Sequence, residues 1–315
     1  MITAAETYLL TYSAHFLLTV LLTINGLNLY PHTIPLMYDE NINFYTILPV
    51  DSPQIAHIEA NPNVTLSLVY DPEKNPVVVS CTAWISNNQT ELDALSPEQL
   101  KKLGYSGNIN SKAKFIRFAV HSLTHDGKTL EGLPYSGPSP ASTNSNIPLS
   151  SNTPKCNTKE VLSIIRETIT ANRVGHLFST NNTTVHARLM QTLWHDKLGM
   201  YHITYAGTRK LSDYAVNPHC ALLFSDAVHQ RQLAVEATAT MHTDTALKTL
   251  AWAPHLAEFG FEGPESDGWV LVTYAPTRIF VREMIDGKEE GRKEEKEICC
   301  NPNEIQAVLS QNEEL

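Results

Sequence analysis

The fold is decided by the stretch Val185–Ala239, which reads VHARLMQTLWHDKLGMYHITYAGTRKLSDYAVNPHCALLFSDAVHQRQLAVEATA. Short runs of β-branched, aromatic and other apolar residues alternate in it with short polar segments. Apolar runs of this length, separated by turn residues, are typical of antiparallel strands. The stretch therefore predicts a set of neighbouring strands, and the same pattern can be followed outward in both directions.

Upstream, the same order of segments occurs a second time. The pair Asn217-Pro218 follows Asn61-Pro62 by 156 residues, and Thr238-Ala239 follows Thr82-Ala83 by the same 156. Hairpin turns are expected at Asn25-Gly26 and at Asn181-Asn182, because these residue types tolerate positive φ. We therefore predict an internal duplication.

Each repeat is expected to begin with a helix and continue with strands. The predicted helices are 4–15 and 158–171, and the predicted strands are 16–24, 29–38, 42–48, 64–70, 77–85, 115–123, 174–180, 185–194, 200–205, 221–225 and 233–241. Since strands outnumber helices, the fold class is mainly β, with each repeat a small β-barrel with flanking helices. Two barrels in one chain would form a covalent pseudo-dimer.

The boundary between the repeats is expected at 134–157, a segment of 24 residues with five Pro, six Ser, four Asn and a single charge. Such a segment is too poor in apolar residues to order itself. The predicted division is a first repeat at 1–133, this linker, a second repeat at 158–284, and a charged, disordered tail at 285–315.

The 315 residues carry a formal net charge of −10, which argues against nucleic acid or an anionic membrane as a partner. No Lys or Arg precedes Lys74, so the apolar stretch 9–24 lacks the cationic flank of a signal peptide. Five Cys without a C-x-x-C pair suit a reducing compartment and suggest no metal site. We expect a cytoplasmic protein, a monomeric pseudo-dimer or a homodimer, that acts on a small molecule.

Basic residues distinguish the second repeat from the first. The second repeat holds Arg188, Thr208-Arg209-Lys210 and Arg231-Gln232, where the first holds Ile34 or Pro35, Ser52-Pro53-Gln54 and Asn75-Pro76. If the strands that carry them are neighbours, the cations and hydroxyls form an anion site suited to a phosphate. The alternative is that they are ordinary surface cations.

Five segments in this order resemble the pyridoxamine 5′-phosphate oxidase-like, FMN-binding split-barrel superfamily. They are Ala187-Arg188-Leu189, Ile203–Lys210, Asn217-Pro218, Ala221–Phe224 and Arg231-Gln232-Leu233. The resemblance implies two split-barrel repeats with FMN bound where the barrels meet. It implies the following cofactor-binding residues: Arg188, Thr208, Arg209 and Lys210 at the phosphate, Thr204 and the backbone near Met190 beside the ring, and Arg231 and Gln232 at the flavin edge.

Departures from the family pattern narrow the expected activity. Leu193 stands where true pyridoxamine 5′-phosphate oxidases have a Lys, and their substrate-phosphate motifs have no counterpart here. The chain is closer to the general-stress-protein branch. We expect an FMN-dependent oxidoreductase that acts on a small molecule other than vitamin B6, with at most one FMN per chain. The sequence identifies no catalytic residue.

Two alternatives remain open. Some split barrels bind or degrade haem, and candidate axial ligands are His176, His186, His195, His219, His229 and His242. The loss of cations from the first repeat favours a third interpretation, a binding or scaffold module without a cofactor.

Overall fold

The chain divides into two compact units, Met1–Leu149 (unit 1) and Ser150–Leu315 (unit 2), in the computed structural model. The structure describes residues 18–25, 28–38, 44–69, 76–86, 89–103, 105, 113–125, 128–131, 158–182, 185–226, 231–284, 293–299, 305 and 307–309. The predicted helix 4–15 and the predicted linker 134–157 lie outside these residues. Each unit is described by itself.

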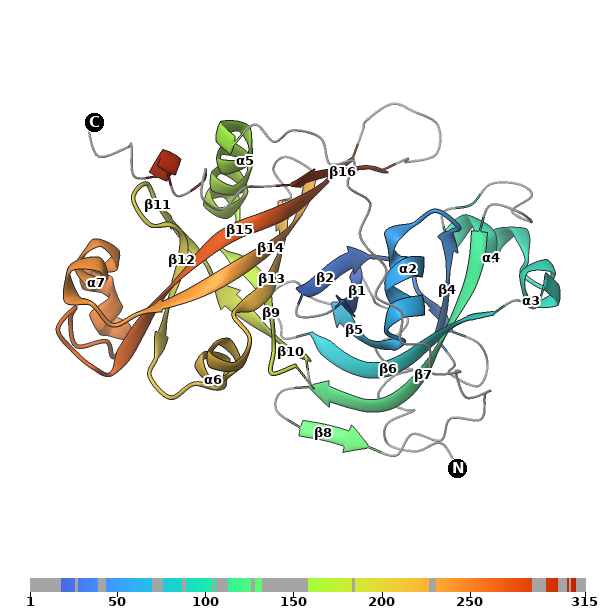
Figure 1. Ribbon diagram of the computed structural model, residues 1–315, viewed down its shortest axis with the longest axis horizontal. Helices are drawn as coiled ribbons and strands as arrows, with labels where there is room; N and C mark the ends of the chain where they lie inside the picture. Colours follow the sequence, from blue (N-terminus) through green and yellow to red (C-terminus); the bar gives the residue numbers. More distant parts are fainter. Residues whose placement is uncertain are drawn as a thin grey trace. The chain divides into compact units, whose positions relative to one another are not determined.

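Unit 1 is built on one curled antiparallel sheet (Figure 1). Its strands are β1 (Leu18–Asn25), β2 (Asn28–Thr33), β3 (Met37–Tyr38), β4 (Phe44–Pro49), β5 (Asn63–Val69), β6 (Val77–Ser86), β7 (Ala113–His125) and β8 (Lys128–Glu131). The order across the sheet is β2-β1-β5-β6-β7-β4-β3, with β8 paired to β7. Three helices accompany it: α2 (Pro53–Ala60), α3 (Gln89–Asp93) and α4 (Pro97–Lys102).

Unit 2 has a sheet of the same design. Its strands are β9 (Val174–Thr180), β10 (Val185–Gln191), β11 (Leu193–His195), β12 (Gly199–Tyr205), β13 (His219–Asp226), β14 (Arg231–His242), β15 (Trp269–Met284) and β16 (Lys293–Cys299). The order is β10-β9-β13-β14-β15-β12-β11, with β16 paired to β15. The helices are α5 (Thr158–Ala171), α6 (Arg209–Val216), α7 (Thr245–Ala251) and the 3₁₀ helix η1 (Pro254–Phe259).

The two sheets agree in detail as well as in strand order. The offset that relates the two Asn-Pro pairs also relates both ends of α2 to those of α6, and the first residue of β7 to that of β15. The irregularity between Ser80 and Cys81 in β6 recurs between Glu236 and Ala237 in β14. The predicted fold class, mainly β with two curled antiparallel sheets and few helices, is confirmed.

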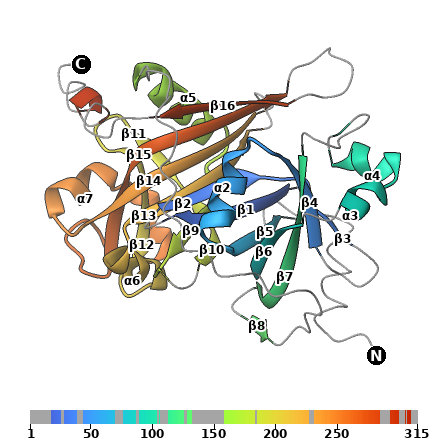
Figure 2. The same cartoon turned by 45° about the vertical axis from the view of Figure 1, so that its right-hand side comes forward.

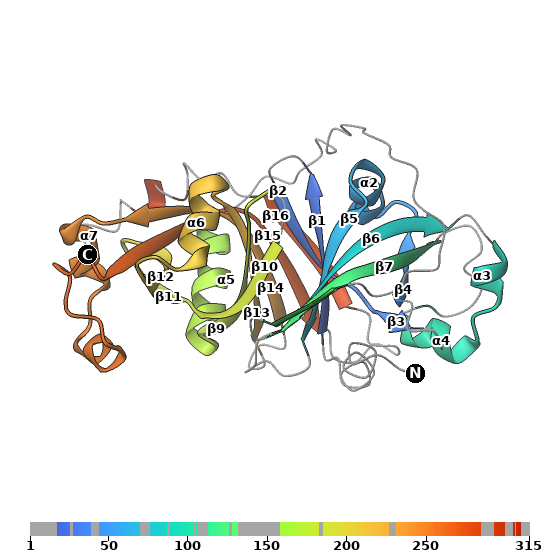
Figure 3. The same cartoon turned by 90° about the horizontal axis from the view of Figure 1, so that it is seen from below.

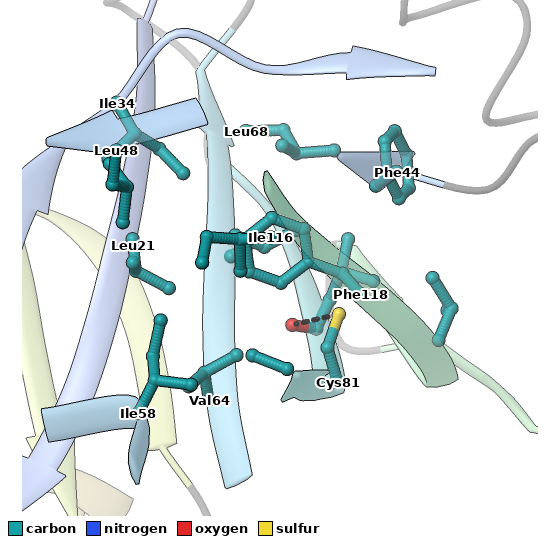
Figure 4. Close-up of a cluster of buried hydrophobic side chains, with 14 of the residues drawn as sticks. Leu21, Ile34, Phe44, Leu48, Ile58, Val64, Leu68, Cys81, Ile116 and Phe118 are labelled. Atoms are coloured by element: carbon teal, nitrogen blue, oxygen red, sulfur yellow. Dashed lines mark hydrogen bonds between the residues drawn. The ribbon is translucent and has the colours of Figure 1, made fainter. Parts of the chain in front are cut away.

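Each sheet encloses a core of its own. In unit 1 the cluster includes Leu21 of β1, Val64 of β5, Phe118 of β7 and Ile58 of α2, all of them almost inaccessible to solvent (Figure 4). In unit 2, α5 buries Val161, Ile165 and Ile169 at helical spacing against the sheet. The apolar stretch 9–24 thus supplies core residues where it is described, as Val20, Leu21 and Leu22 are fully buried.

An Asn-Pro pair follows helix α2 in unit 1 and helix α6 in unit 2, and its Asn is the residue at which each helix ends. Asn61 and Asn217 both have an extended backbone, with φ of −144° and −143°, and both side-chain oxygens accept the amide two residues later at 3.0 Å. Asn217 Nδ2 also donates to Asn182 Oδ1 (2.8 Å), in the β9–β10 turn. Asn182 has a φ of 73°, as predicted for this tight turn.

The structure contains elements that the sequence did not predict, among them helices α2 and α6 and the long strand β15. Both helices lie between predicted strands, in segments for which no helix was predicted. The segment 285–315 was predicted to be a disordered tail, but within it β16 pairs with β15, from Lys293 opposite Met284 to Cys299 opposite Arg278 (Figure 2). Ile305 and Leu309 pack against Leu162 of α5. In the described part of the chain no helix is long and apolar enough to cross a bilayer.

Candidate functional site

Helix α6 carries the charged residues that organise unit 2, and it packs against β9 and β14 (Figure 3). Its buried residues are Lys210, Asp213 and Tyr214. These positions are three and four residues apart, so they share one face of the helix. The face that α6 turns toward the sheet is therefore polar and charged, which is unusual for a helix packed on a core.

Asp213 is the centre of a hydrogen-bonded cluster. Its Oδ2 accepts from Ser179 Oγ (2.6 Å), His186 Nδ1 (3.0 Å) and Arg188 Nη2 (3.3 Å), and Arg188 Nη2 also donates to Ser179 Oγ (3.0 Å). Ser179 lies on β9, and His186 and Arg188 lie two residues apart on β10, so that both side chains leave the same face of the strand. We call these four residues the Asp213 cluster.

Lys210 forms a second polar group beside this cluster. Its ammonium donates to Thr204 Oγ1 at 2.6 Å, and Thr204 Oγ1 lies 3.3 Å from Thr208 Oγ1. Thr208 is the residue before α6, and its side chain makes no capping hydrogen bond to the helix. Lys210 is only 8% exposed, and among the described residues no carboxylate forms an ion pair with its ammonium. A cation is thus buried in this part of the structure without a counter-ion.

The charges of these groups influence one another. Burial and the neighbouring Arg188 guanidinium lower the pKa of Lys210 to about 8. Burial by itself would raise the pKa of the Asp213 carboxyl, but hydrogen bonds from His186 and Ser179 and the charges of His186 and Arg188 bring that pKa below its ordinary value. At neutral pH Asp213 is therefore ionised, and Lys210 is mostly protonated.

A neutral hydrogen-bonded chain lies deeper in the same unit. Tyr214 Oη is 3.0 Å from Tyr274 Oη, which is 2.5 Å from His202 Nδ1. Burial, followed by the charges of Lys210 and Arg188, holds the pKa of His202 well below its ordinary value. Burial raises the pKa of both tyrosines well above theirs. These three side chains are uncharged at neutral pH, so the net charge of the site comes from the Asp213 cluster and Lys210.

Of the eight residues predicted to bind a cofactor, the structure brings four together: Arg188, Thr204, Thr208 and Lys210. Arg209 is the exposed first residue of α6. Met190 packs against the core of unit 2. Arg231 forms an ion pair with Glu167 of α5 (3.3 Å), and Gln232 pairs with Ser225, on the face of the sheet opposite to Arg188.

Two residues of the Asp213 cluster, Ser179 and Asp213, were not identified from the sequence, and His186 was considered only as a haem ligand. Their positions in the sequence gave little indication of a site, because Asp213 lies on a helix that was not predicted. One signal was available: Asp213 follows Lys210 by three residues, which places the two on one face of any helix formed there.

The residue of unit 1 that corresponds to Arg188 is not the one predicted from the sequence. The strand register places Arg188 opposite Leu177, and at the offset of the repeat it places His32 opposite Leu21. The counterpart is thus His32, not Ile34 or Pro35. By the same offset His57 corresponds to Asp213, Thr23 to Ser179 and Tyr30 to His186. Thr23 Oγ1 is 2.9 Å from His57 Nδ1, and the rings of Tyr30 and His32 lie 4.3 and 5.7 Å from that of His57.

Three of the candidate haem ligands form hydrogen bonds within unit 2. His186 Nδ1 contacts Asp213, His195 Nδ1 accepts from the Lys197 amide (3.1 Å), and His242 Nε2 is 2.8 Å from Thr273 Oγ1. His229 lies outside the described residues. In the described ranges no group of three or more His, Cys, Asp or Glu residues is arranged to hold a metal ion.

Part of unit 2 matches a known family. Residues 164–282 match the family model described as pyridoxamine 5′-phosphate oxidase.

The chain is 25% identical to the general stress protein 26 of Bacillus anthracis, over 41% of this chain and 96% of that chain, with a TM-score of 0.34. It is 17% identical to a protein from Clostridium acetobutylicum related to general stress protein 26, over 47% and 98%, with a TM-score of 0.36. A heme binding protein from Mycobacterium smegmatis matches at 11% identity, over 49% and 62%, with a TM-score of 0.35. Among curated proteins, none matches the chain.

Proposed function

We propose that unit 2, whose residues 164–282 belong to the pyridoxamine 5′-phosphate oxidase-like superfamily, binds FMN through its phosphate and serves in the oxidation or reduction of a small molecule. When bound, FMN supplies the electron-transfer chemistry, while the protein binds and orients it. The residues that hold the phosphate are Arg188, Thr204, Thr208, Arg209 and Lys210.

The observation that carries this proposal is the buried ammonium of Lys210. A buried charge without an opposite charge beside it is costly, and here the cost appears as a pKa lowered to about 8. A phosphate beside Lys210 would supply the missing negative charge and accept the two hydrogens that Thr204 does not take. The donor set therefore fits a phosphate monoester.

The neighbouring groups suit the same ligand. Thr208 precedes α6, whose first amide groups point out of the helix, and helix N-termini favour anions. Arg209, the first residue of the helix, is exposed and can approach the phosphate from solvent. Arg188 pairs with Asp213 and Ser179 through Nη2, and its other N–H groups would donate to the phosphate.

Ring contacts are the second part of the proposal. Gln232 Oε1 is buried and has no hydrogen-bond partner among the described residues, so an acceptor is available for a flavin N–H. The backbone near Met190 on β10 would lie along the ring. Unit 1 has His32, Leu48, Ser52, Pro53 and Gln54 at the positions of the phosphate residues, and we propose that it holds no phosphate of its own.

Titration of the purified chain with FMN and with riboflavin, which lacks the phosphate, tests the proposal. We expect FMN to bind at least about tenfold more tightly than riboflavin, because charge-assisted hydrogen bonds to the phosphate are lost with riboflavin. The double variant Arg209→Ala, Lys210→Ala should remove that preference, and the matched control Lys159→Ala, an exposed cation on α5, should keep it.

The outcomes separate the candidate functions. Equal affinity for FMN and riboflavin, or two equivalents of FMN per chain, contradicts the proposal. An absorbance spectrum of the purified chain distinguishes a flavin from a haem with its Soret band, and a chain that binds neither is the scaffold alternative.

A further inference from the structure

The guanidinium of Arg188 is held by two buried oxygen atoms of unit 2. Its Nη2 donates to Ser179 Oγ (3.0 Å) and to Asp213 Oδ2 (3.3 Å), and Ser179 Oγ in turn donates to the same Oδ2 (2.6 Å). Ser179 is fully buried and the Asp213 side chain is 3% exposed, whereas the Arg188 side chain is 20% exposed. In the described part of the chain the guanidinium bonds through Nη2 alone, so the N–H groups of Nε and Nη1 remain for a ligand.

Arg188 is joined through Asp213 to the helix that carries Lys210. Asp213 follows Lys210 by three residues on α6, and both are buried on the face that packs on the sheet. Residues three apart on one helix face lie about 5–6 Å apart at Cβ. Burial and then the charge of Arg188 lower the pKa of Lys210, which agrees with this closeness. The guanidinium and the ammonium therefore lie on the same face of α6, where both can donate to one phosphate.

We infer that Ser179 and Asp213 are positioning residues, which orient the Arg188 guanidinium toward the phosphate of FMN. The inference rests on the proposed function, because that phosphate is the ligand of Lys210. An arginine side chain has many rotamers, and ordering it when a ligand binds costs conformational entropy. A guanidinium that two buried oxygen atoms already hold loses less entropy on binding, so the phosphate is bound more tightly.

The Ser179 hydroxyl allows orientation to be separated from charge. It accepts from Arg188 and donates to Asp213, so it holds both side chains in place. Without it, Nη2 of Arg188 would be held by Asp213 alone, at the longer of its two distances (3.3 Å). Because replacement of Ser179 changes no charge, its effect on phosphate binding reports on the orientation of the guanidinium.

Unit 1 has the hydroxyl at this position but no guanidinium. Thr23 corresponds to Ser179, and its Oγ1 lies 2.9 Å from Nδ1 of His57, the residue that corresponds to Asp213. His32 has the position of Arg188 and lacks the fork of N–H groups that binds a phosphate through two hydrogen bonds. A hydroxyl thus bonds to the helix side chain in both units, and Thr23 indicates that this position accepts a threonine.

Fluorescence titration of Ser179→Ala with FMN and with riboflavin tests the inference. We expect FMN affinity to fall about fivefold, because Arg188 loses a hydrogen bond that holds it in place. Riboflavin affinity should stay unchanged, since riboflavin has no phosphate for Arg188 to contact. Ser179→Thr keeps the hydroxyl and should recover most of the FMN affinity. The matched control Ser163→Ala removes a hydrogen bond to Glu167 on the exposed side of α5 and should change neither affinity.

A double variant shows whether Ser179 acts through Arg188. In a chain that already carries Arg188→Met, adding Ser179→Ala should change FMN affinity by less than about twofold, because no guanidinium is left to orient. The full loss in that background, or equal losses of FMN and riboflavin affinity in Ser179→Ala alone, would indicate a general structural role and overturn the inference.

The affinities of the unaltered chain separate the inference from the proposed function. If this chain binds FMN more tightly than riboflavin and Ser179→Ala keeps the whole preference, the inference is overturned and the proposed function stands. If the unaltered chain binds the two flavins equally, the proposed function fails and the inference fails with it.

Discussion

The side chains around Asp213 in unit 2 differ from those around His57 in unit 1, although the two residues occupy the same position in the fold. In unit 2, Asp213 joins Ser179, His186 and Arg188, and in unit 1, His57 joins Thr23, Tyr30 and His32 at the same places in the fold. A charged cluster and a cluster of imidazole and phenol rings thus occupy equivalent sites. Both units thus have a hydrogen-bonded side chain on the helix at this point, and the two centres differ in their charge.

The largest effect is expected from neutralising the centre of unit 2. Asp213→Asn leaves the partly buried Arg188 without its carboxylate, and breaking such a pair costs about 3 kcal/mol of unfolding free energy. Tryptophan fluorescence during denaturant unfolding reports on it, because three of the four Trp residues lie in unit 2. Asp196→Asn is the control: its ion pair with Arg166 is exposed, so a loss above about 1 kcal/mol there would contradict the argument.

A smaller effect is expected from moving the charges of unit 2 into unit 1. His57→Asp places a carboxylate in a site that is 2% exposed, beside His32 in place of an arginine, and should cost about 2 kcal/mol. Adding His32→Arg should recover more than half of that loss, since the pair of Asp213 and Arg188 is then reproduced. Hydrogen exchange of unit 1 peptides, followed by mass spectrometry, measures both. Equal losses in the single and double variants would show that the two centres are not equivalent.

The smallest effect concerns pH. The pKa of Lys210 is about 8 in the folded chain and near 10.5 when unfolded, so between these values the unfolded chain binds more protons and stability rises with pH. From pH 8 to 9.5 the gain is about 1.5 kcal/mol. Burial raises the pKa of Cys81 and Cys220, which acts in the opposite direction over the same range.

Because the thiols of Cys81 and Cys220 also affect the pH dependence, the measurement compares chains that all contain both of them. Thermal unfolding is followed at pH 8 and at pH 9.5 for the unaltered chain and for Lys210→Met. The unfolding free energy of the unaltered chain should rise by about 1.5 kcal/mol relative to that of Lys210→Met between the two pH values. The control Lys159→Met removes an exposed cation and should behave like the unaltered chain. Identical pH profiles for the unaltered chain and Lys210→Met would mean that Lys210 titrates normally.

Much of the fold could be predicted from the sequence. The helix 158–171 and the strand 174–180 have the predicted bounds, and most other predicted strands differ by one to three residues, because period-two patterns and turn residues act locally. Strands β8, β15 and β16 were not predicted. The predicted strands 29–38 and 185–194 are each divided in two, into β2 and β3 and into β10 and β11. Tertiary pairing decided this, since β3 and β11 pair with β4 and β12 instead of with the first strand of their unit.

Helix α6 shows why the site was only partly predictable. A search for helices relies on apolar residues at helical spacing, but the buried face of α6 consists of Lys210, Asp213 and Tyr214. A helix this short is not stable alone, and its formation depends on the sheet against which it packs. The cations could be named from the sequence, while the carboxylate that organises them could not.

Residue order alone predicts most strands, the turn at Asn181-Asn182, the constant offset of 156 residues between matching segments and the concentration of cations in the second half. These are properties of the residue order itself, so they can be recognised before any tertiary contact is known. Tertiary packing brings Ser179, His186 and Arg188 to Asp213, buries Lys210 with no counter-ion among the described residues, and gives His32 the position in unit 1 that Arg188 has in unit 2. Each of these requires side chains from separate strands and a helix to meet at one point, and no local pattern encodes that meeting.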